Sequence, residues 1–586
     1  MSAKKPSHKS AKAADSPADK ASAPAHQPGA IKETIESIVI AFVLAFVFRA
    51  YVVEAFVIPT GSMAPTLLGE HLSVKCSQCG YAYTMDLPER GLPRGGAATP
   101  CPMCKHMEPF PPGARSSTGD RILVHKYLYS LSKPKRWDVV VFKNPQRPKY
   151  YGDEANGPLV NYIKRLVGLP GEEIRIVEGN IYFRPAMGDQ PWQAARKTER
   201  INVQRAVWQP VYHSKYLPLD GGWKSGQPGP RWRLPWEIAE GEAHWSLPSG
   251  GEPGQMPPIR PDRSDYRFND PGRGALKFNF HNVIATNLHD GMWHVYPYNL
   301  FRFYERGFDY EPIEDLRLSV TLRPDDEGLS VLLRTEARVD ATGDSPDPRG
   351  QVLAARVTAD GQVQLLRGPR PYRDYEQVEY EVIESKALAP IRTDRATTVE
   401  LWFVDHEASV WVDGERVLAR QFDIEMDHIL SRPPLHPDQF PHVGVEVEGS
   451  PVTLHDVKLD RDLYYAAKQS SSHVFARAGI YKNPDDPGRL RSGDPLTLFK
   501  AGPGDERNSE YFCVGDNSPS SHDGRFWENV DPWIEHNMFA GEHRPGVVPE
   551  QLMMGRAFFV YFPAMHRYTP TGPGIFVNFG KLRFIH

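Results

Sequence analysis

The sequence predicts a mainly β protein: a β domain after one N-terminal transmembrane helix, interrupted by a zinc ribbon and a β-sandwich. The 586 residues include 55 prolines and 48 glycines, which suit short strands and loops better than a helical protein. A chain of this length exceeds one compact core, so about two to four domains are expected. The 69 basic and 73 acidic side chains nearly cancel, which argues against a nucleic-acid partner.

The first 53 residues divide into a tail and an apolar segment. Residues 1–33 contain too few large apolar side chains to form a core, which predicts a disordered tail. Residues 34–53 supply roughly the 20 residues that a membrane span requires. A cleaved signal peptide and a buried core helix are the alternatives, but no small-x-small site follows, which favours an uncleaved anchor. The lysines before the helix predict a cytoplasmic N-terminus, with everything after Val53 outside.

Ser62, in "IPTGSMAPTLL", lies just after the predicted helix and is a candidate nucleophile. A serine hydroxyl needs a base, and neither a G-x-S-x-G motif nor a recognisable His/Asp arrangement accompanies it. A lysine serves as base only if its pKa is lowered from about 10.4. Lys164, in "NYIKRLVGLPGEEI", has apolar neighbours and an alternation typical of a strand. Alone it reads as an ordinary solvated lysine, but with Ser62 it forms a candidate Ser-Lys dyad.

Four segments occur in the order found in type I bacterial signal peptidases, which the chain resembles. They are "PTGSMAPTL", "GDRILVHKY", "YIKRLVGLPGEEI" and "VGDNSPSSHDGRFW". "WDVVVFKNP" and "VPEQLMMGRAFFVYFP" are also similar to that family, and the resemblance covers residues 30–75, 118–185 and about 495–586. It implies a signal-peptidase-like β catalytic domain formed from residues 54–185 and 466–586.

The resemblance also implies roles for individual residues. Ser62 matches the nucleophile, Lys164 the general base, and Thr60 the hydroxyl that joins the Ser62 N–H in an oxyanion hole. Ser521 matches a serine that orients the lysine. Four further positions match supporting polar residues, or else form a structural loop network: Asp516, Asp523, Arg525 and Arg165, of which Asp516 and Arg165 are expected to pair.

Two positions depart from the family's usual pattern. Ser518 stands where the family usually has Arg, and Gly524 where it usually has Ser. Neither departure removes the dyad, but both put the network around it in doubt.

A cysteine-rich insertion is expected over residues 75–118. Cys76-x-x-Cys79 and Cys101-x-x-Cys104 offer four thiolates in two short turns, the pattern of a closed structural Zn²⁺ site that resembles a zinc ribbon. Outside the cytoplasm disulfides are favoured, so each Cys-x-x-Cys closing on itself is the alternative. With four protein ligands the metal has no catalytic position, and catalysis needs no cofactor.

The largest insertion lies between the Lys164 segment and the final one. Residues 186–270 are rich in Trp and Pro, which favours aromatic anchoring of irregular loops over a sugar- or peptide-stacking surface. Residues 271–465 show strand alternation, with "TTVELWFVDHEASVWVDGERVL" predicting a hairpin at Asp413-Gly414. The pattern predicts a β-sandwich that resembles laminin-G or concanavalin-like folds, with an unknown ligand.

The favoured function is a membrane-bound serine endopeptidase, signal peptidase I, which cleaves signal peptides from exported preproteins after small-x-small sites. Its partners are these preproteins and membrane lipid, and its place is the cytoplasmic membrane, single-pass, with the catalytic domain outside. The alternative is a membrane-anchored carbohydrate- or wall-binding protein with an inactive peptidase half. A self-cleaving repressor would need a DNA-binding N-terminus, where this chain has the apolar segment. Both insertions are expected to be separable from catalysis.

Overall fold

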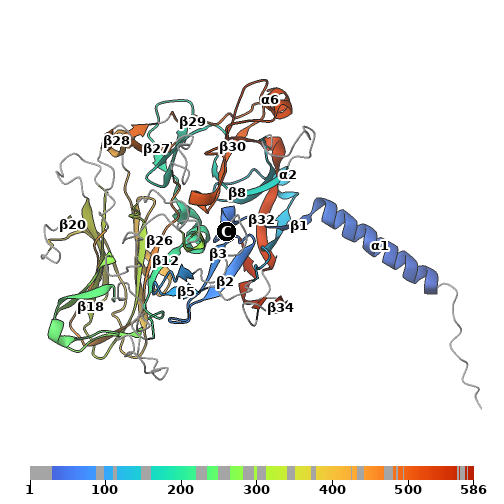
Figure 1. The fold of residues 1–586 in the computed structure, drawn as a ribbon. Coiled ribbons are helices and arrows are strands. Elements are labelled where there is room, and N and C mark those ends of the chain that lie inside the picture. Colours follow the sequence, from blue (N-terminus) through green and yellow to red (C-terminus); the bar gives the residue numbers. More distant parts are fainter. Residues whose placement is uncertain are drawn as a thin grey trace, which may run out of the picture. The chain divides into compact units, whose positions relative to one another are not determined.

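The computed structural model, shown in Figure 1, separates into two compact units, Met1–Val53 and Glu54–His586. The residues that it describes are 30–87, 98–109, 115–146, 160–219, 234–248, 264–280, 296–299, 312–339, 350–370, 378–423, 425–431, 441–466, 479–483, 486–492, 494–563, 566–567, 574–576 and 579–586. The tail predicted over residues 1–33 lies mostly outside the described residues.

The first unit contains helix α1, Ala30–Tyr51. No proline or glycine interrupts it, and large apolar side chains occur on every side. Those of Phe42, Leu44 and Phe46 are 60%, 62% and 64% exposed. None of the helices within the described residues is long and apolar enough to cross a membrane. The span predicted over residues 34–53 is therefore not confirmed and remains a prediction.

The second unit begins with an eight-stranded sheet that joins the two ends of the chain. Its path is β1 (Val53–Val57), β6 (Arg121–His125), β32 (Met553–Phe562), β7 (Val139–Lys143), β8 (Asn161–Gly168), β30 (Glu510–Val514) and β31 (Val548–Pro549), with β35 (Arg583–Phe584) against β32. The late strand β32 lies antiparallel between β6 and β7, and β30 pairs with β8. Segments far apart in sequence thus form one sheet.

A six-stranded sheet and two small hairpins adjoin these segments. The six strands are β11 (Gln193–Ala194), β10 (Asn180–Pro185), β9 (Glu172–Val177), β27 (Gly479–Asn483), β28 (Asp486–Ser492) and β29 (Leu496–Thr497). The hairpins are β2 (His71–Lys75) with β3 (Ala82–Asp86), and β4 (Ala98–Pro100) with β5 (Met107–Pro109). A third small hairpin pairs β33 (His566–Arg567) with β34 (Gly574–Phe576). The described residues also include the helices α2 (Leu128–Leu131), α3 (Ile201–Val207), α5 (Met426–Ser431) and α6 (Pro532–Met538).

Two larger sheets occupy the middle of the chain and are called the two-sheet insert below. One contains β14 (Trp245–Ser246), β15 (Tyr266–Phe268), β26 (Val452–Arg461), β17 (Leu316–Pro324), β22 (Thr397–Val404), β23 (Glu407–Val412), β24 (Glu415–Gln421) and β12 (Gln209–His213). The other contains β13 (Trp236–Glu240), β16 (Gly274–Phe278), β25 (Val443–Glu448), β18 (Ser330–Ala337), β19 (Gln351–Val357), β20 (Gln362–Pro369) and β21 (Glu381–Ala387). Alternate side chains of both sheets share one hydrophobic core.

The insert differs in detail from the sequence prediction. The segment predicted as one hairpin forms three strands. Besides the predicted turn at Asp413-Gly414, a second left-handed turn lies at Asp405 and His406, whose φ angles are 48° and 59°. Strands β12–β15 lie before residue 271, within the stretch expected to be irregular. They are too short to show an alternation. Trp236 and Trp245 of this stretch are buried in the shared core, which agrees with packing rather than an open stacking surface.

The insert also shares a core with the peptidase-like segments. Tyr296 and Tyr298 are 1% and 3% exposed and belong to a hydrophobic cluster with Val140 and Phe512. Residues 54–586 accordingly form one compact unit. The two parts thus bury apolar surface against each other, and the expectation that the insert is separable from catalysis stays a prediction.

Candidate active site

Ser62 lies in a one-turn 3-10 helix, η1 (Gly61–Met63), that follows strand β1. Met63 is fully buried in a cluster with Ile122 and Val139 of the eight-stranded sheet. Ala64 is also fully buried. The apolar residues after Ser62 thus anchor the turn in the hydrophobic core, while Ser62 itself stays half-buried.

Lys164 lies on β8, opposite Val140 of β7, and its side chain is brought to Ser62. Its Nζ is 2.8 Å from Ser62 Oγ and 3.1 Å from the Ile163 carbonyl oxygen. The residue is only 4% exposed, and this burial lowers the pKa of Lys164 to about 8. A neutral amine next to a hydroxyl is the arrangement that a lysine base needs.

Arg165, the next residue along β8, points to the opposite side of the strand and makes a buried ion pair. Its Nε and Nη2 each lie 2.7 Å from a carboxylate oxygen of Asp516, and both side chains are fully buried. Thr66 donates to the same carboxylate at 2.5 Å. This bidentate pair links β8 to the loop after β30 and to the segment after Ser62.

Asp523 and Arg525 form a second buried pair in the loop after β30. Asp523 accepts hydrogen bonds from the Gly515 N–H at 2.8 Å and from Arg525 Nε at 2.8 Å. Burial would raise the pKa of Asp523, but Arg525 outweighs it and lowers that pKa below its usual value. The hydrogen bonds of both residues described here lie within the loop, so the geometry places them in the loop network rather than at the reacting atoms.

Ser521 lies close to Ser62 without the expected bond to the lysine. Its Oγ is buried and has no hydrogen-bond partner among the described atoms. A Cβ added to Gly515 would lie 2.2 Å from Ser521 Oγ and 2.5 Å from the Ser62 carbonyl oxygen. Ser521 therefore packs beside the nucleophile turn through Gly515, which has no room for a side chain.

The structure gives a reason for both departures from the family pattern. Arg525 donates to Ser518 Oγ at 2.6 Å, and Ser518 Oγ also accepts from the Ala466 N–H at 2.7 Å. Ser518 thus joins Arg525 to the chain that returns from the insert. A Cβ at Gly524 would lie 2.4 Å from the Gly546 carbonyl oxygen, so a serine does not fit there without a backbone shift.

Thr60 precedes η1 in an extended conformation, with φ −123° and ψ 157°. Its side chain is exposed and makes no capping hydrogen bond to the turn. It therefore stands on the solvent side of Ser62, where a substrate would approach.

Asn517 was not singled out from the sequence, although it lies inside the segment "VGDNSPSSHDGRFW". Its N–H donates to the Ser62 carbonyl oxygen at 3.1 Å, and its Nδ2 donates to the Gly61 carbonyl oxygen at 2.9 Å. It thus holds the backbone on both sides of the nucleophile. The sequence marks Asn517 only as a polar residue directly after Asp516. Such residues are common in loops, so its position alone does not indicate a role at the site.

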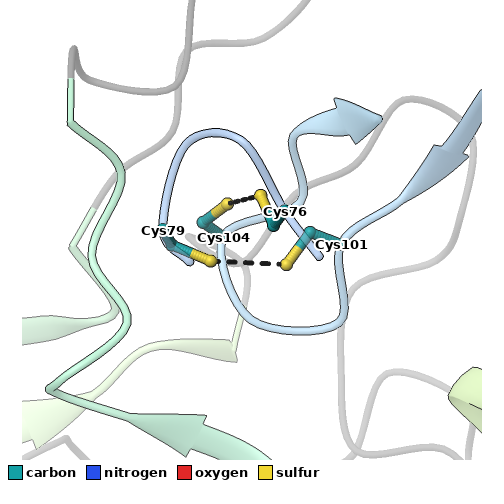
Figure 2. Close-up of side chains that lie close together, drawn as sticks. All are labelled: Cys76, Cys79, Cys101 and Cys104. Carbon is teal, nitrogen blue, oxygen red and sulfur yellow. Dashed lines mark hydrogen bonds between the residues drawn. The ribbon is translucent and has the colours of Figure 1, made fainter. Parts of the chain in front are cut away.

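The four predicted metal-ligand cysteines come together between the two small hairpins (Figure 2). Cys76 Sγ lies 3.6 Å from Cys104 Sγ, and Cys79 Sγ lies 3.5 Å from Cys101 Sγ. A tetrahedral Zn²⁺ site with Zn–S of about 2.3 Å has sulfur–sulfur edges of about 3.8 Å, so the cluster has nearly the right size. All four are free thiols, and the two closest pairs join different motifs, unlike the disulfide alternative.

The two cysteine turns are built alike. In each, the N–H four residues after the first cysteine donates to that cysteine's carbonyl oxygen at 3.0 Å: Gly80 to Cys76 and Lys105 to Cys101. Both donors have positive φ, 74° and 59°. Two matching turns that present two sulfurs each fit one tetrahedral metal site.

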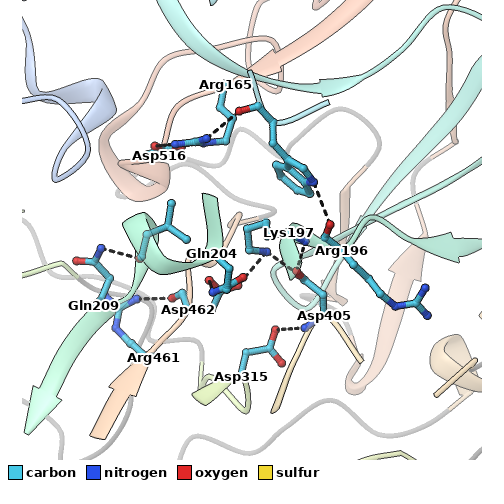
Figure 3. Close-up of polar contacts among 12 residues, drawn as sticks. Arg165, Arg196, Lys197, Gln204, Gln209, Asp315, Asp405, Arg461, Asp462 and Asp516 are labelled. Carbon is cyan, nitrogen blue, oxygen red and sulfur yellow. Dashed lines mark hydrogen bonds and ion pairs between the residues drawn. The ribbon is translucent and has the colours of Figure 1, made fainter. Parts of the chain in front are cut away.

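A third polar cluster gathers Asp315, Asp405 and Asp462 around Lys197 (Figure 3). Lys197 Nζ lies 2.6 Å from an Asp405 oxygen and 2.9 Å from an Asp462 oxygen. Burial, together with the nearby Asp405 and Asp462, raises the pKa of Asp315 well above its usual value. The Lys197 ammonium group already supplies the cation that a metal ion would supply, so we interpret the cluster as a structural ion network.

Comparison with known proteins agrees with the sequence resemblance over part of the chain. Residues 31–91 and 114–223 match the family described as "Signal peptidase, peptidase S26". A "Probable signal peptidase I-2" of Synechocystis sp. is 28% identical over 163 residues, covering 27% of this chain and 49% of the relative. "Signal peptidase I" of Pseudomonas fluorescens is 26% identical over 193 residues, covering 31% and 51%. The chain thus spans about half the length of these relatives.

The solved structures add no argument about the insert. A carbohydrate-binding module, CBM66 from Bacillus subtilis, matches 39% of this chain and 95% of that module, with 10% identity and a TM-score of 0.21. This similarity is too low to assign a fold or a ligand.

Proposed function

We propose that this protein is a membrane-bound serine endopeptidase that removes signal peptides from exported preproteins after small-x-small sites. The observation that carries the proposal is the 2.8 Å approach of the Lys164 amine to the Ser62 hydroxyl. The lowered pKa of Lys164, about 8, leaves part of the lysine population neutral near neutral pH. The partial match to the signal peptidase family supplies the substrate class.

The proposed reaction follows from this geometry. Neutral Lys164 takes the Ser62 proton as Oγ attacks the scissile carbonyl carbon. The Ser62 N–H and the Thr60 hydroxyl stabilise the oxyanion that forms. The protonated lysine gives its proton to the leaving amine, which yields an acyl-enzyme and the free mature protein. Lys164 then activates a water that hydrolyses the ester and releases the signal peptide.

The location of the enzyme is part of the proposal. Helix α1 carries exposed apolar side chains on all sides, and lysines precede it in the sequence. We assign residues 34–53 as a single anchor in the cytoplasmic membrane, in contact with lipid, with the N-terminus cytoplasmic and the catalytic segments outside. A nucleophile about ten residues after the anchor meets substrates that are held in the same membrane. Release of the protein from isolated membranes by salt alone would contradict the anchor.

Cys76, Cys79, Cys101 and Cys104 are proposed to hold one structural zinc ion. When bound, the zinc would couple the two hairpins and contribute to folding, with no position open for catalysis. Elemental analysis should find about one zinc per chain, with the four thiols protected from alkylation. Reactive thiols and no metal in the purified protein would contradict this assignment.

The function is tested with purified protein and a labelled preprotein, comparing wild type with Ser62→Ala. Wild type should release the mature protein at a small-x-small site, and Ser62→Ala should not. Folded wild-type protein that leaves several preproteins intact would instead favour a binding protein with an inactive peptidase half. Equal cleavage by Ser62→Ala would assign the nucleophile elsewhere.

A further inference from the structure

A short segment of the insert reaches the nucleophile turn. The 3-10 helix η6 (Pro297–Asn299) lies against strand β3, and Tyr298 and Asn299 are 3% and 0% exposed. The Tyr298 ring covers Gly61, since a Cβ added there would lie 2.3 Å from Tyr298 Cε1. A side chain at position 61 would therefore displace the buried Tyr298 ring of the insert.

Asn299 meets Asn517, the residue that holds the backbone on both sides of Ser62. Asn299 Nδ2 donates to Asn517 Oδ1 at 2.5 Å, and Asn517 Nδ2 donates back to Asn299 Oδ1 at 3.0 Å. The second hydrogen of Asn517 Nδ2 is directed to the Gly61 carbonyl oxygen at 2.9 Å. Every polar atom of the Asn517 side chain is thus satisfied, and both side chains are fully buried.

The reciprocal pair and the Gly61 carbonyl oxygen together fix which edge of the Asn517 amide faces the turn that carries Ser62. If this amide rotated by half a turn, its oxygen would face the Gly61 carbonyl oxygen, and two acceptors would repel each other. Without Asn299, Asn517 Oδ1 is left buried without a donor, and the Gly61 carbonyl oxygen alone holds the amide in the observed orientation. The position of Gly61 and Ser62 then loses one of its supports.

We propose that Asn299 is a positioning residue for Ser62, which it holds in register with Lys164 through Asn517. This inference rests on the proposed peptidase function and deepens it: the insert supplies part of the support for the nucleophile. The hydrogen bonds of the Asn299 side chain go to Asn517, not to Ser62 Oγ or Lys164 Nζ, so Asn299 acts on the dyad indirectly, through Asn517.

The first experiment compares Asn299→Ala with Asn279→Ala in the full chain, using a peptide with a small-x-small site. Asn279 is a matched control, because it is an asparagine of the same insert whose Nδ2 donates to Glu237 at 2.9 Å, outside the site. Asn299→Ala should lower kcat about 10- to 100-fold with KM within about threefold, as expected for a displaced nucleophile. Asn279→Ala should stay within about twofold. A kcat for Asn299→Ala within about threefold of wild type would overturn the proposal.

A double-mutant cycle tests whether the effect passes through Asn517. In the Asn517→Ala background, Asn299→Ala should change kcat by less than about twofold, because the residue that it orients is gone. If the two losses multiply instead, Asn299 acts by another route and the proposal is wrong. If Asn299→Ala does not fold, Asn299→Leu, which keeps the size and removes the amide, replaces it in both measurements.

The assay separates failure of this inference from failure of the proposed function. If wild type does not cleave, or if Ser62→Ala cleaves equally well, the peptidase assignment fails and Asn299 has no nucleophile to position. If cleavage depends on Ser62 but not on Asn299, the function stands and only the inference fails.

Discussion

Two buried lysines of this protein have opposite electrostatic environments. Lys164 and Lys197 are 4% and 2% exposed. Lys197 is held by Asp405 and Asp462 at 2.6 and 2.9 Å, whereas Lys164 has no ion pair among the described residues. Burial lowers the pKa of Lys164 to about 8. Burial acts on Lys197 in the same direction, but its two carboxylates outweigh it and raise its pKa above the ordinary value.

The difference shows that burial alone does not decide what a lysine does. Removing water disfavours the ammonium form, and a neutral amine results only if no carboxylate compensates. Asp523, the carboxylate that acts most strongly on Lys164, is itself occupied by Arg525. The two aspartates of the loop after β30 thus pair with arginines, Asp516 with Arg165 and Asp523 with Arg525. Because neither forms an ion pair with Lys164, the lysine is available as a base.

The largest loss of cleavage activity is expected when Lys164, rather than Lys197, is replaced. Lys164→Met should reduce cleavage by at least about 10³-fold, because it removes the amine that is hydrogen-bonded to Ser62 Oγ. It should leave the fold intact, since it removes a buried amine without a carboxylate partner. Steady-state cleavage and circular dichroism are the measurements. Near-normal turnover at pH 8 would show that another group is the base.

A smaller loss is expected at the oxyanion position. Thr60→Val should lower kcat on the order of 10²–10³-fold, because one donor to the transition state is lost while the dyad remains. Thr60→Ser, which keeps the hydroxyl, is the matched control and should stay within about tenfold. A change below about threefold for Thr60→Val would remove Thr60 from the site.

The smallest effect on activity is expected for Lys197→Met. This variant leaves Asp405 and Asp462 buried without their cation, which should lower the free energy of unfolding by about 3–5 kcal/mol. The kcat of the molecules that remain folded should stay within about threefold. Urea unfolding gives the first quantity, and cleavage well below the unfolding midpoint gives the second. Unchanged stability would contradict the structural assignment of this cluster.

The sequence predicted the two residues of the candidate dyad better than the residues that hold them in place. Ser62 and Lys164 were paired because the residues around each are distinctive, and the four cysteines because their spacing is. Asn299 follows no periodic pattern, and its role depends on a fold that brings it to Asn517, 218 positions away. The bond expected from Ser521 to Lys164 is absent for the same reason, since side-chain direction in a loop is set by packing.

The large sheets show the same limit. Long alternating strands such as β17 and β22 were predicted from their period of two, whereas the short strands β12–β15 were not. The sequence also did not distinguish Lys164 from Lys197, because the carboxylates of Lys197 come from positions 208 and more residues away.

The central claim is that Lys164 acts as a neutral base, and the pH dependence of single-turnover cleavage tests it most directly. Because the pKa of Lys164 is lowered to about 8, the neutral base is lost as the pH falls below that value. The rate should rise about tenfold per pH unit below pH 8 and level off above it, while Lys197→Met should leave this profile unchanged. A rate that is flat between pH 6 and 9, with chemistry shown to be rate-limiting, would contradict the account.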